Sequence, residues 1–142
     1  MNTNPKAKSI VCYGNSNTWG ADPETDTGDR HPANVRWTGV LQNSLGLEYE
    51  VIEEGLCGRT LAAEEKGKLH RTGITHLQAI LETHEPINFL IIMLGTNDMK
   101  STFGLTAENI ADHLRQTIQF VQKGRDELKV IIVCPPPVVN PK

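Results

Sequence analysis

The sequence predicts an α/β fold in which helices cover a small parallel sheet. Two observations carry this prediction. First, short apolar runs alternate with segments of helical periodicity along the chain. Second, the runs are almost continuously apolar, which is typical of parallel strands buried on both faces. The expected strands are Ser9–Tyr13, Tyr49–Glu53, Asn88–Leu94 and Lys129–Cys134.

Helices are expected between these strands. The clearest one begins after Thr106, which is a suitable N-cap, and stops at Gly124, which favours helix termination. Its apolar residues recur at helical spacing and would face the sheet. The expected helices are Val35–Leu45, Ile74–His84 and Ala107–Lys123. The length of 142 residues suits one domain over residues 1–142.

Composition excludes several classes of protein. The chain is 38% hydrophobic and 22% charged with a net charge of -3, which is ordinary for a globular protein and gives no basic surface for nucleic acid. The apolar runs are of strand length, so we expect no membrane span, and the N-terminus lacks the apolar stretch of a signal peptide. The three cysteines have no paired spacing, which predicts reduced thiols and a cytoplasmic location.

A polar turn follows the first expected strand directly. In Gly14-Asn15-Ser16-Asn17, Ser16 would lie at the carboxyl end of a parallel strand, where open α/β folds bind their ligands. A serine hydroxyl becomes a nucleophile when a base adjoins it, so Ser16 is a candidate nucleophile. Turn formation by the asparagines alone explains the same residues. A phosphate-binding loop is a weaker alternative, because no glycine-rich nucleotide motif occurs.

Two further strand ends carry candidate oxyanion donors. Gly55 could offer its backbone N–H and Asn97 its side-chain amide, with the N–H of Ser16 as a third donor. A helix-capping turn explains Asn97 and Asp98 equally well. The polar loops Ala21–Asn34 and Thr60–Gly73 follow two of these turns. We expect them on the surface, as candidate walls of a substrate site.

No general base for Ser16 is evident. The chain has five histidines, none in an Asp-x-x-His pattern after a late strand. We expect each of them on the surface, and the alternative is that His31 or His70 folds over the site. No group of histidines, cysteines or carboxylates has the spacing of metal ligands, so no metal site is predicted. The histidines are His31, His70, His76, His84 and His113, the last of which is expected to be solvated beside the apolar face of its helix.

Together the motifs resemble those of the SGNH hydrolases, also called GDSL-type esterases. Three blocks stand in the order and spacing of that family: Tyr13–Gly20, Glu53–Thr60 and Ile92–Asp98. The segments Val35–Leu41 and Val133–Pro137 are similar to its bacterial arylesterase and acyltransferase branch. The resemblance extends over nearly the whole chain from about Lys8 onward.

The resemblance implies a flavodoxin-like three-layer α/β/α sandwich with parallel strands in the order 2-1-3-4-5. It also implies an enzyme that hydrolyses small carboxylic esters, or transfers their acyl group, through an acyl-enzyme on Ser16. The backbone N–H of Ser16, Gly55 and the Asn97 side chain would form the oxyanion hole. No cofactor and no metal are implied. The residues that would shape the substrate pocket are Trp19, Asn15 and Asp98.

Two departures from the family pattern stand out. Asn15 occupies the position of an aspartate, so the turn loses a charge and gains a hydrogen-bond donor. The Asp-x-x-His block, which supplies the base after a fifth strand, is not found, so the sheet is expected to lack its last strand and helix. The alternative function is therefore a truncated or degenerate remnant that binds ligands or is inactive. The expected partners are a small-molecule ester and a second copy of the chain, with no nucleic acid and no membrane.

Overall fold

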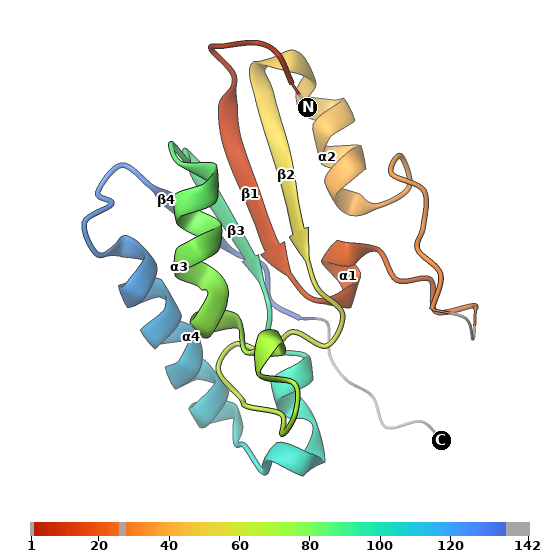
Figure 1. Ribbon diagram of the computed structural model, residues 1–142, viewed down its shortest axis with the longest axis vertical. Coiled ribbons are helices and arrows are strands. Elements are labelled where there is room, and N and C mark those ends of the chain that lie inside the picture. The colour runs from red at the N-terminus through yellow and green to blue at the C-terminus, as the bar shows by residue number, and fades with distance from the viewer. Residues whose placement is uncertain (1, 26–27, 136–142) are drawn as a thin grey trace.

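The computed structural model describes residues 2–25 and 28–135, and within them one parallel sheet forms the centre of the molecule (Figure 1). Its order is β2-β1-β3-β4, and every neighbouring pair is parallel. This confirms the predicted α/β fold and agrees with the first four strands of the order 2-1-3-4-5. The strands are β1 Lys8–Gly14, β2 Tyr49–Gly55, β3 Phe89–Met93 and β4 Lys129–Ile132.

The helices lie close to their predicted positions. The long helix α4 starts after Thr106, whose hydroxyl accepts the Asn109 N–H at 3.2 Å while the Asn109 side chain accepts the Thr106 N–H at 3.0 Å. This reciprocal cap confirms the predicted start. The helices are α1 Ser16–Trp19, α2 Trp37–Leu45, α3 Gly73–His84 and α4 Ala107–Gln122, and single 3-10 turns are η1 Gly46–Glu48, η2 Leu69–Arg71, η3 Asn97–Met99 and η4 Ser101–Phe103.

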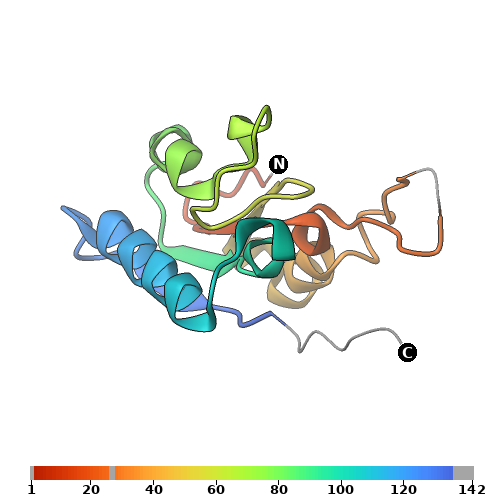
Figure 2. The same ribbon diagram turned by 90° about the horizontal axis from the view of Figure 1, so that it is seen from below.

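Helices cover the two faces of the sheet unequally. The helices α3 and α4 pack on one face and α2 packs on the other (Figures 1 and 2). The larger core lies under α3 and α4 and includes Val11, Leu77, Leu90 and Val121, all of them fully buried. Across residues 2–25 and 28–135, no helix is long and apolar enough to cross a membrane. The three cysteines are free thiols, as predicted.

The carboxyl ends of three strands meet at one edge of the sheet. In the register, Gly14 of β1 lies opposite Gly55 of β2 on one side and Met93 of β3 on the other. The segments that follow these residues therefore begin side by side, with α1 at the same end of the sheet (Figure 1). These segments carry Ser16, the turn after β2, and Asn97.

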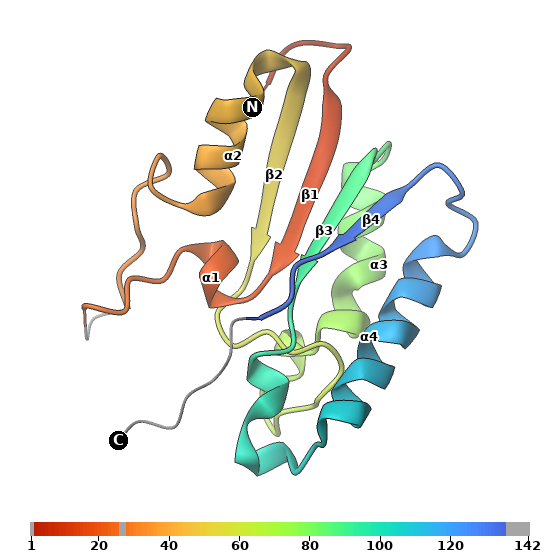
Figure 3. The same ribbon diagram turned by 180° about the vertical axis from the view of Figure 1, so that it is seen from behind.

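The strand β4 has a free edge in the described part of the chain. It pairs with β3 on one side only, and Ile131 is 45% exposed. Figure 3 shows that no described helix covers β3 and β4 on the α2 face. The strand ends at Ile132 rather than at Cys134, and Pro136 and Pro137 lie outside the described residues. An apolar edge with unpaired backbone groups is a template for pairing with another strand.

We therefore expect the 142-residue chain to associate through β4. Light scattering of the purified chain should give a mass above that of the monomer. Ile131→Lys places a charge on the exposed side of this strand and should shift the chain toward monomer. A monodisperse wild-type monomer with a cooperative thermal transition would contradict this expectation.

Candidate active site

The serine turn is a single helical turn built on the end of β1. Asn15, which is 2% exposed, is the N-cap of α1, and its side-chain oxygen accepts the Asn17 N–H at 3.0 Å. An amide oxygen therefore performs the capping that an aspartate would perform at this position. The turn closes at Gly20, whose N–H donates to the Ser16 carbonyl at 2.8 Å. Ser16 itself is half-buried as the first residue of α1.

The structure gives Gly55 a packing role. A Cβ atom at Gly55 would lie 2.1 Å from the backbone nitrogen of Trp19, so no side chain fits between β2 and α1. The N–H of the next residue, Leu56, donates to the Gly14 carbonyl at 3.1 Å. Because parallel strands direct alternate N–H groups to opposite sides, the N–H of Gly55 points away from β1. This geometry explains the glycine without a donor role.

The turn after β2 offers another glycine, which the sequence analysis missed. Gly58 has a φ of 80°, a conformation that glycine adopts readily. Its N–H has no hydrogen-bond partner among the residues that the structure describes. The Arg59 carbonyl, one residue on, accepts the Asn97 side-chain N–H at 2.9 Å. The unused donor of Gly58 therefore belongs to the residue that precedes the hydrogen-bond partner of Asn97.

Asn97 is held in place by this same bond. It begins η3, which is separated from the end of β3 by residues 94–96, and is half-buried. A side-chain amide has two N–H donors, and the Arg59 carbonyl takes one of them. The second donor is the one that could serve an oxyanion.

Asp98 lies beneath the site and not in a substrate pocket, contrary to expectation. It is 0% exposed, and its carboxylate accepts the backbone N–H of Leu61 at 2.8 Å and those of Ala62 and Ala63 at 3.4 Å. Nδ1 of His113 lies 3.9 Å from the same carboxylate. The carboxylate thus anchors the beginning of the predicted loop Thr60–Gly73.

Two predictions of surface exposure are wrong, and both concern residues that contact the Asp98 carboxylate. Leu61 is 1% exposed, so the first part of the Thr60–Gly73 loop belongs to the core and only its middle is at the surface. The His113 side chain is 23% exposed, because α4 turns it toward Asp98 and away from solvent. Residues 26–27 of the other predicted loop, Ala21–Asn34, lie outside the described residues.

Asp98→Ala is expected to lower the free energy of unfolding by roughly 3 kcal/mol, because it leaves several buried N–H groups without an acceptor. Urea denaturation measures this change. The matched control is Asp126→Ala, since Asp126 is exposed at the opposite end of the sheet and should change stability by no more than about 0.5 kcal/mol. Equal effects of the two substitutions would contradict the anchoring role.

Two of the other histidines lie beside carboxylates. Nε2 of His84 lies 2.8 Å from a Glu54 oxygen, and Nδ1 of His31 lies 3.7 Å from an Asp22 oxygen. In the described part of the chain, no histidine forms a hydrogen bond with Ser16. The described residues also contain no group of three or more histidines, cysteines and carboxylates that could hold a metal ion.

Trp19 lies at the start of the polar loop. Its side chain is half-buried, and the Arg30 guanidinium carbon sits 5.1 Å from the ring centroid. The Nε of Arg30 donates to the Trp19 carbonyl at 2.6 Å. Arg30 therefore fixes Trp19 next to the serine turn, which is compatible with the predicted pocket wall.

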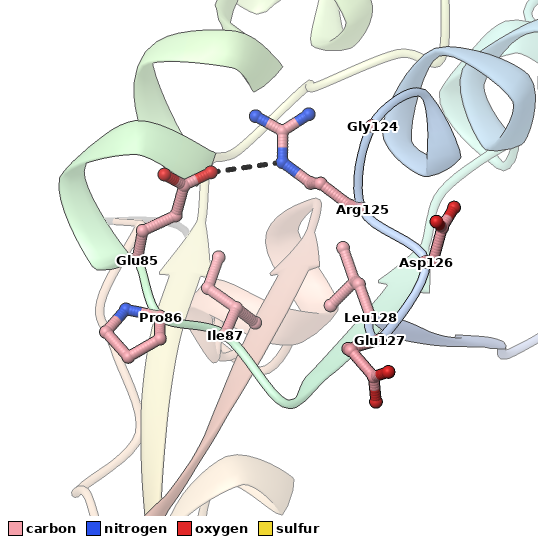
Figure 4. A pocket seen from close by; sticks show the side chains of 8 residues that line it. All are labelled: Glu85, Pro86, Ile87, Gly124, Arg125, Asp126, Glu127 and Leu128. Carbon is pink, nitrogen blue, oxygen red and sulfur yellow. Dashed lines mark hydrogen bonds and ion pairs between the residues drawn. The ribbon is translucent and has the colours of Figure 1, made fainter.

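A hollow of about 520 Å³ lies at the other end of the sheet (Figure 4). Ile87 and Leu128 line it from just before β3 and β4, and an Arg125–Glu85 ion pair of 3.1 Å crosses it. It is separated from Ser16 by the length of the strands. We therefore place the candidate active site at the carboxyl edge.

Comparison with known proteins identifies the family. Residues 12–142 match the GDSL-like lipase/acylhydrolase family. A carbohydrate acetylesterase from Sinorhizobium meliloti is similar to the chain at 36% identity and a TM-score of 0.86, over 94% of this chain and 66% of that one. The native aryl esterase of M. smegmatis is similar at 38% identity and a TM-score of 0.84, over 94% and 66%.

These similarities extend along nearly all of the present chain but less of the others. The chain spans less than two thirds of the length of the solved structures it resembles. No curated protein matches it in sequence. The family match and the shared fold lead to one conclusion: this chain belongs to the GDSL-like lipase/acylhydrolase family.

Proposed function

We propose that the chain forms the core of a serine esterase that acts on small carboxylic esters through an acyl-enzyme on Ser16. The observation that carries this proposal is the register that sets Gly14 opposite both Gly55 and Met93. It brings the serine turn, the turn after β2 and Asn97 to one edge. Nucleophile and oxyanion donors on neighbouring strand ends are what acyl transfer requires. The similar proteins from S. meliloti and M. smegmatis are an acetylesterase and an aryl esterase, which supports an ester as substrate.

In the proposed reaction, Oγ of Ser16 attacks the carbonyl carbon of the ester and its proton passes to a general base. The oxyanion of the tetrahedral intermediate accepts hydrogen bonds from the Ser16 N–H and the Asn97 amide. We assign the third donor to Gly58 in place of Gly55, because the N–H of Gly55 points away from β1. Protonation of the leaving oxygen expels the alcohol or phenol and leaves acyl-Ser16. Water then releases the acid, or an alcohol accepts the acyl group.

The general base is the component that the described residues do not provide. Three histidines have a carboxylate nearby, but none of these pairs includes Ser16. The pairs are His31 with Asp22, His84 with Glu54, and His113 with Asp98. Without a base at Ser16, the oxyanion donors and substrate binding remain, and these can supply a residual acceleration of roughly 10³–10⁴ over water.

We therefore expect the isolated 142-residue chain to be a poor catalyst of p-nitrophenyl acetate hydrolysis. Slow release of p-nitrophenol, up to one equivalent per chain, would indicate acylation of Ser16 without turnover. The time course of p-nitrophenol release with substrate in excess over the chain measures this. Efficient multiple turnover by a chain of verified mass would contradict the expectation and would mean that one of the five histidines reaches Ser16. The alternative of a non-catalytic binding module predicts no acylation at all.

A further inference from the structure

The turn after β2 contains a buried arginine that the proposed reaction does not use directly. Arg59 is 6% exposed, and its guanidinium carbon lies 4.1 Å from the centroid of the Tyr13 ring. Among the described residues it has no ion pair with a carboxylate. Burial of a charge is costly unless hydrogen bonds compensate it, so its bonding partners indicate what the residue is for.

Those partners are the ends of two neighbouring strands, β1 and β2. Nη1 of Arg59 donates to the carbonyl of Gly14, the last residue of β1, at 3.1 Å. The same nitrogen also donates to the carbonyl of Glu54, which immediately precedes the last residue of β2. One cation therefore joins the strand that leads to Ser16 with the strand that leads to Gly58.

The backbone of Arg59 makes a third connection. Its N–H donates to the Leu56 carbonyl at 3.0 Å and closes the turn that contains Gly58. Its carbonyl accepts one N–H of Asn97 at 2.9 Å, which fixes the side chain that follows β3. The side chain and the backbone of one residue therefore connect all three strand ends.

The stacking partner of the guanidinium is itself rigid. The Tyr13 hydroxyl donates to the Gly73 carbonyl at 2.7 Å, and the residue is 0% exposed. Burial raises the pKa of Tyr13 to about 12, so the ring stays neutral under the cation. A cation over a fixed aromatic face has little freedom to move.

We propose that Arg59 is the positioning residue of the oxyanion hole: its guanidinium locks the turn that carries the Gly58 N–H, and its carbonyl aims the Asn97 amide. This inference rests on the proposed function. Oxyanion donors stabilise a transition state only when they are already placed where the charge develops. Supporting groups that fix such donors are as necessary as the donors themselves.

The test compares arginines at the two ends of the sheet, in a full-length form of the protein, meaning one that carries the Asp-x-x-His block implied by the family resemblance. Arg59→Met removes the two side-chain hydrogen bonds to Gly14 and Glu54 but keeps an unbranched side chain. Arg125→Met is the matched control, because the Arg125 guanidinium also makes a hydrogen bond, here to the Glu85 side chain, at the far end of the sheet from Ser16. With p-nitrophenyl acetate, we expect Arg59→Met to lower kcat by roughly 10–100-fold with little change in KM, and Arg125→Met to change neither by more than about twofold.

A double substitution shows whether Arg59 acts through Asn97. If it does, Arg59→Met should add little to the loss caused by Asn97→Ala, because the donor is already gone. Losses that multiply fully would overturn the link from the guanidinium to Asn97, and a kcat of Arg59→Met within twofold of wild type would overturn the positioning role as a whole.

A conservative substitution covers the case in which Arg59→Met does not fold. Arg59→Lys keeps the charge but replaces the planar guanidinium, which stacks on Tyr13 and reaches two carbonyls through Nη1, by a flexible ammonium, so we expect a folded protein with kcat at least about fivefold lower. Unchanged kcat in a folded Arg59→Lys protein would refute the positioning role. Failure of the proposed function is a separate result, since it would appear as retained activity in Ser16→Ala.

Discussion

Replacing Ser16 by alanine in a full-length form, meaning one that carries the Asp-x-x-His block, is expected to abolish turnover of p-nitrophenyl acetate. The substitution removes the only atom that can form the proposed acyl-enzyme. The backbone should be unaffected, because the cap of α1 is made by Asn15 and the helix-closing bond is made by the Ser16 carbonyl. Residual hydrolysis should fall to the level that binding and the oxyanion donors alone support.

The matched control for this substitution is Ser9→Ala. Ser9 lies near the opposite end of the same strand, where its hydroxyl donates to the Pro86 carbonyl. Its loss should leave kcat and KM within about twofold of wild type while changing stability slightly. If Ser16→Ala keeps most of the activity of a folded protein, Ser16 is not the nucleophile.

Asn97→Ala should lower kcat by roughly a hundredfold or more with little change in KM. The reason is that an oxyanion donor contributes where charge develops and contributes little to ground-state binding. Steady-state kinetics of the full-length variant with p-nitrophenyl acetate measures both constants.

Asn88→Ala provides the comparison for Asn97. Asn88 also bonds to the backbone through its side chain, since its Oδ1 accepts the Ser9 N–H at 2.9 Å, but it lies at the far end of the sheet. We expect it to affect stability and not the chemical step. A change confined to KM in Asn97→Ala would assign Asn97 to substrate positioning instead.

The fold could be predicted from local patterns. Each of the four strands was found because its residues are apolar and β-prone over a short run, and the start of α4 was found because Thr106 caps it. The family resemblance was also confirmed. Each strand and the helix cap depend on residues that are close together in the sequence, so they can be predicted from a single sequence.

The supports of the candidate site could not be predicted in this way. The bond between Asn97 and Arg59 joins residues 38 positions apart, and the bond between Asp98 and Leu61 joins residues 37 apart. Neither pair has a spacing that local periodicity could reveal. His113 was misplaced for the same reason, because only the packing of α4 brings it to Asp98.

Gly55 illustrates a different limit. A glycine at a strand end fits both a backbone donor and a close contact, and the sequence does not distinguish them. A Cβ at Gly55 would lie 2.1 Å from the backbone nitrogen of Trp19, so the close contact explains this glycine. We assign the role of donor to Gly58, whose φ of 80° and whose N–H, unpaired among the described residues, are visible only in the folded chain.

The central claim, that Ser16 is the nucleophile, is tested most directly by covalent labelling. A fluorophosphonate reacts with an activated serine and leaves a phosphonyl group on its oxygen, with loss of fluoride. Peptide mapping by mass spectrometry of the labelled full-length protein then locates the group. The account predicts one modification per chain, on Ser16, which disappears in Ser16→Ala and is retained in Ser9→Ala. A label on any other residue, or ester hydrolysis that persists after complete labelling of Ser16, would contradict it.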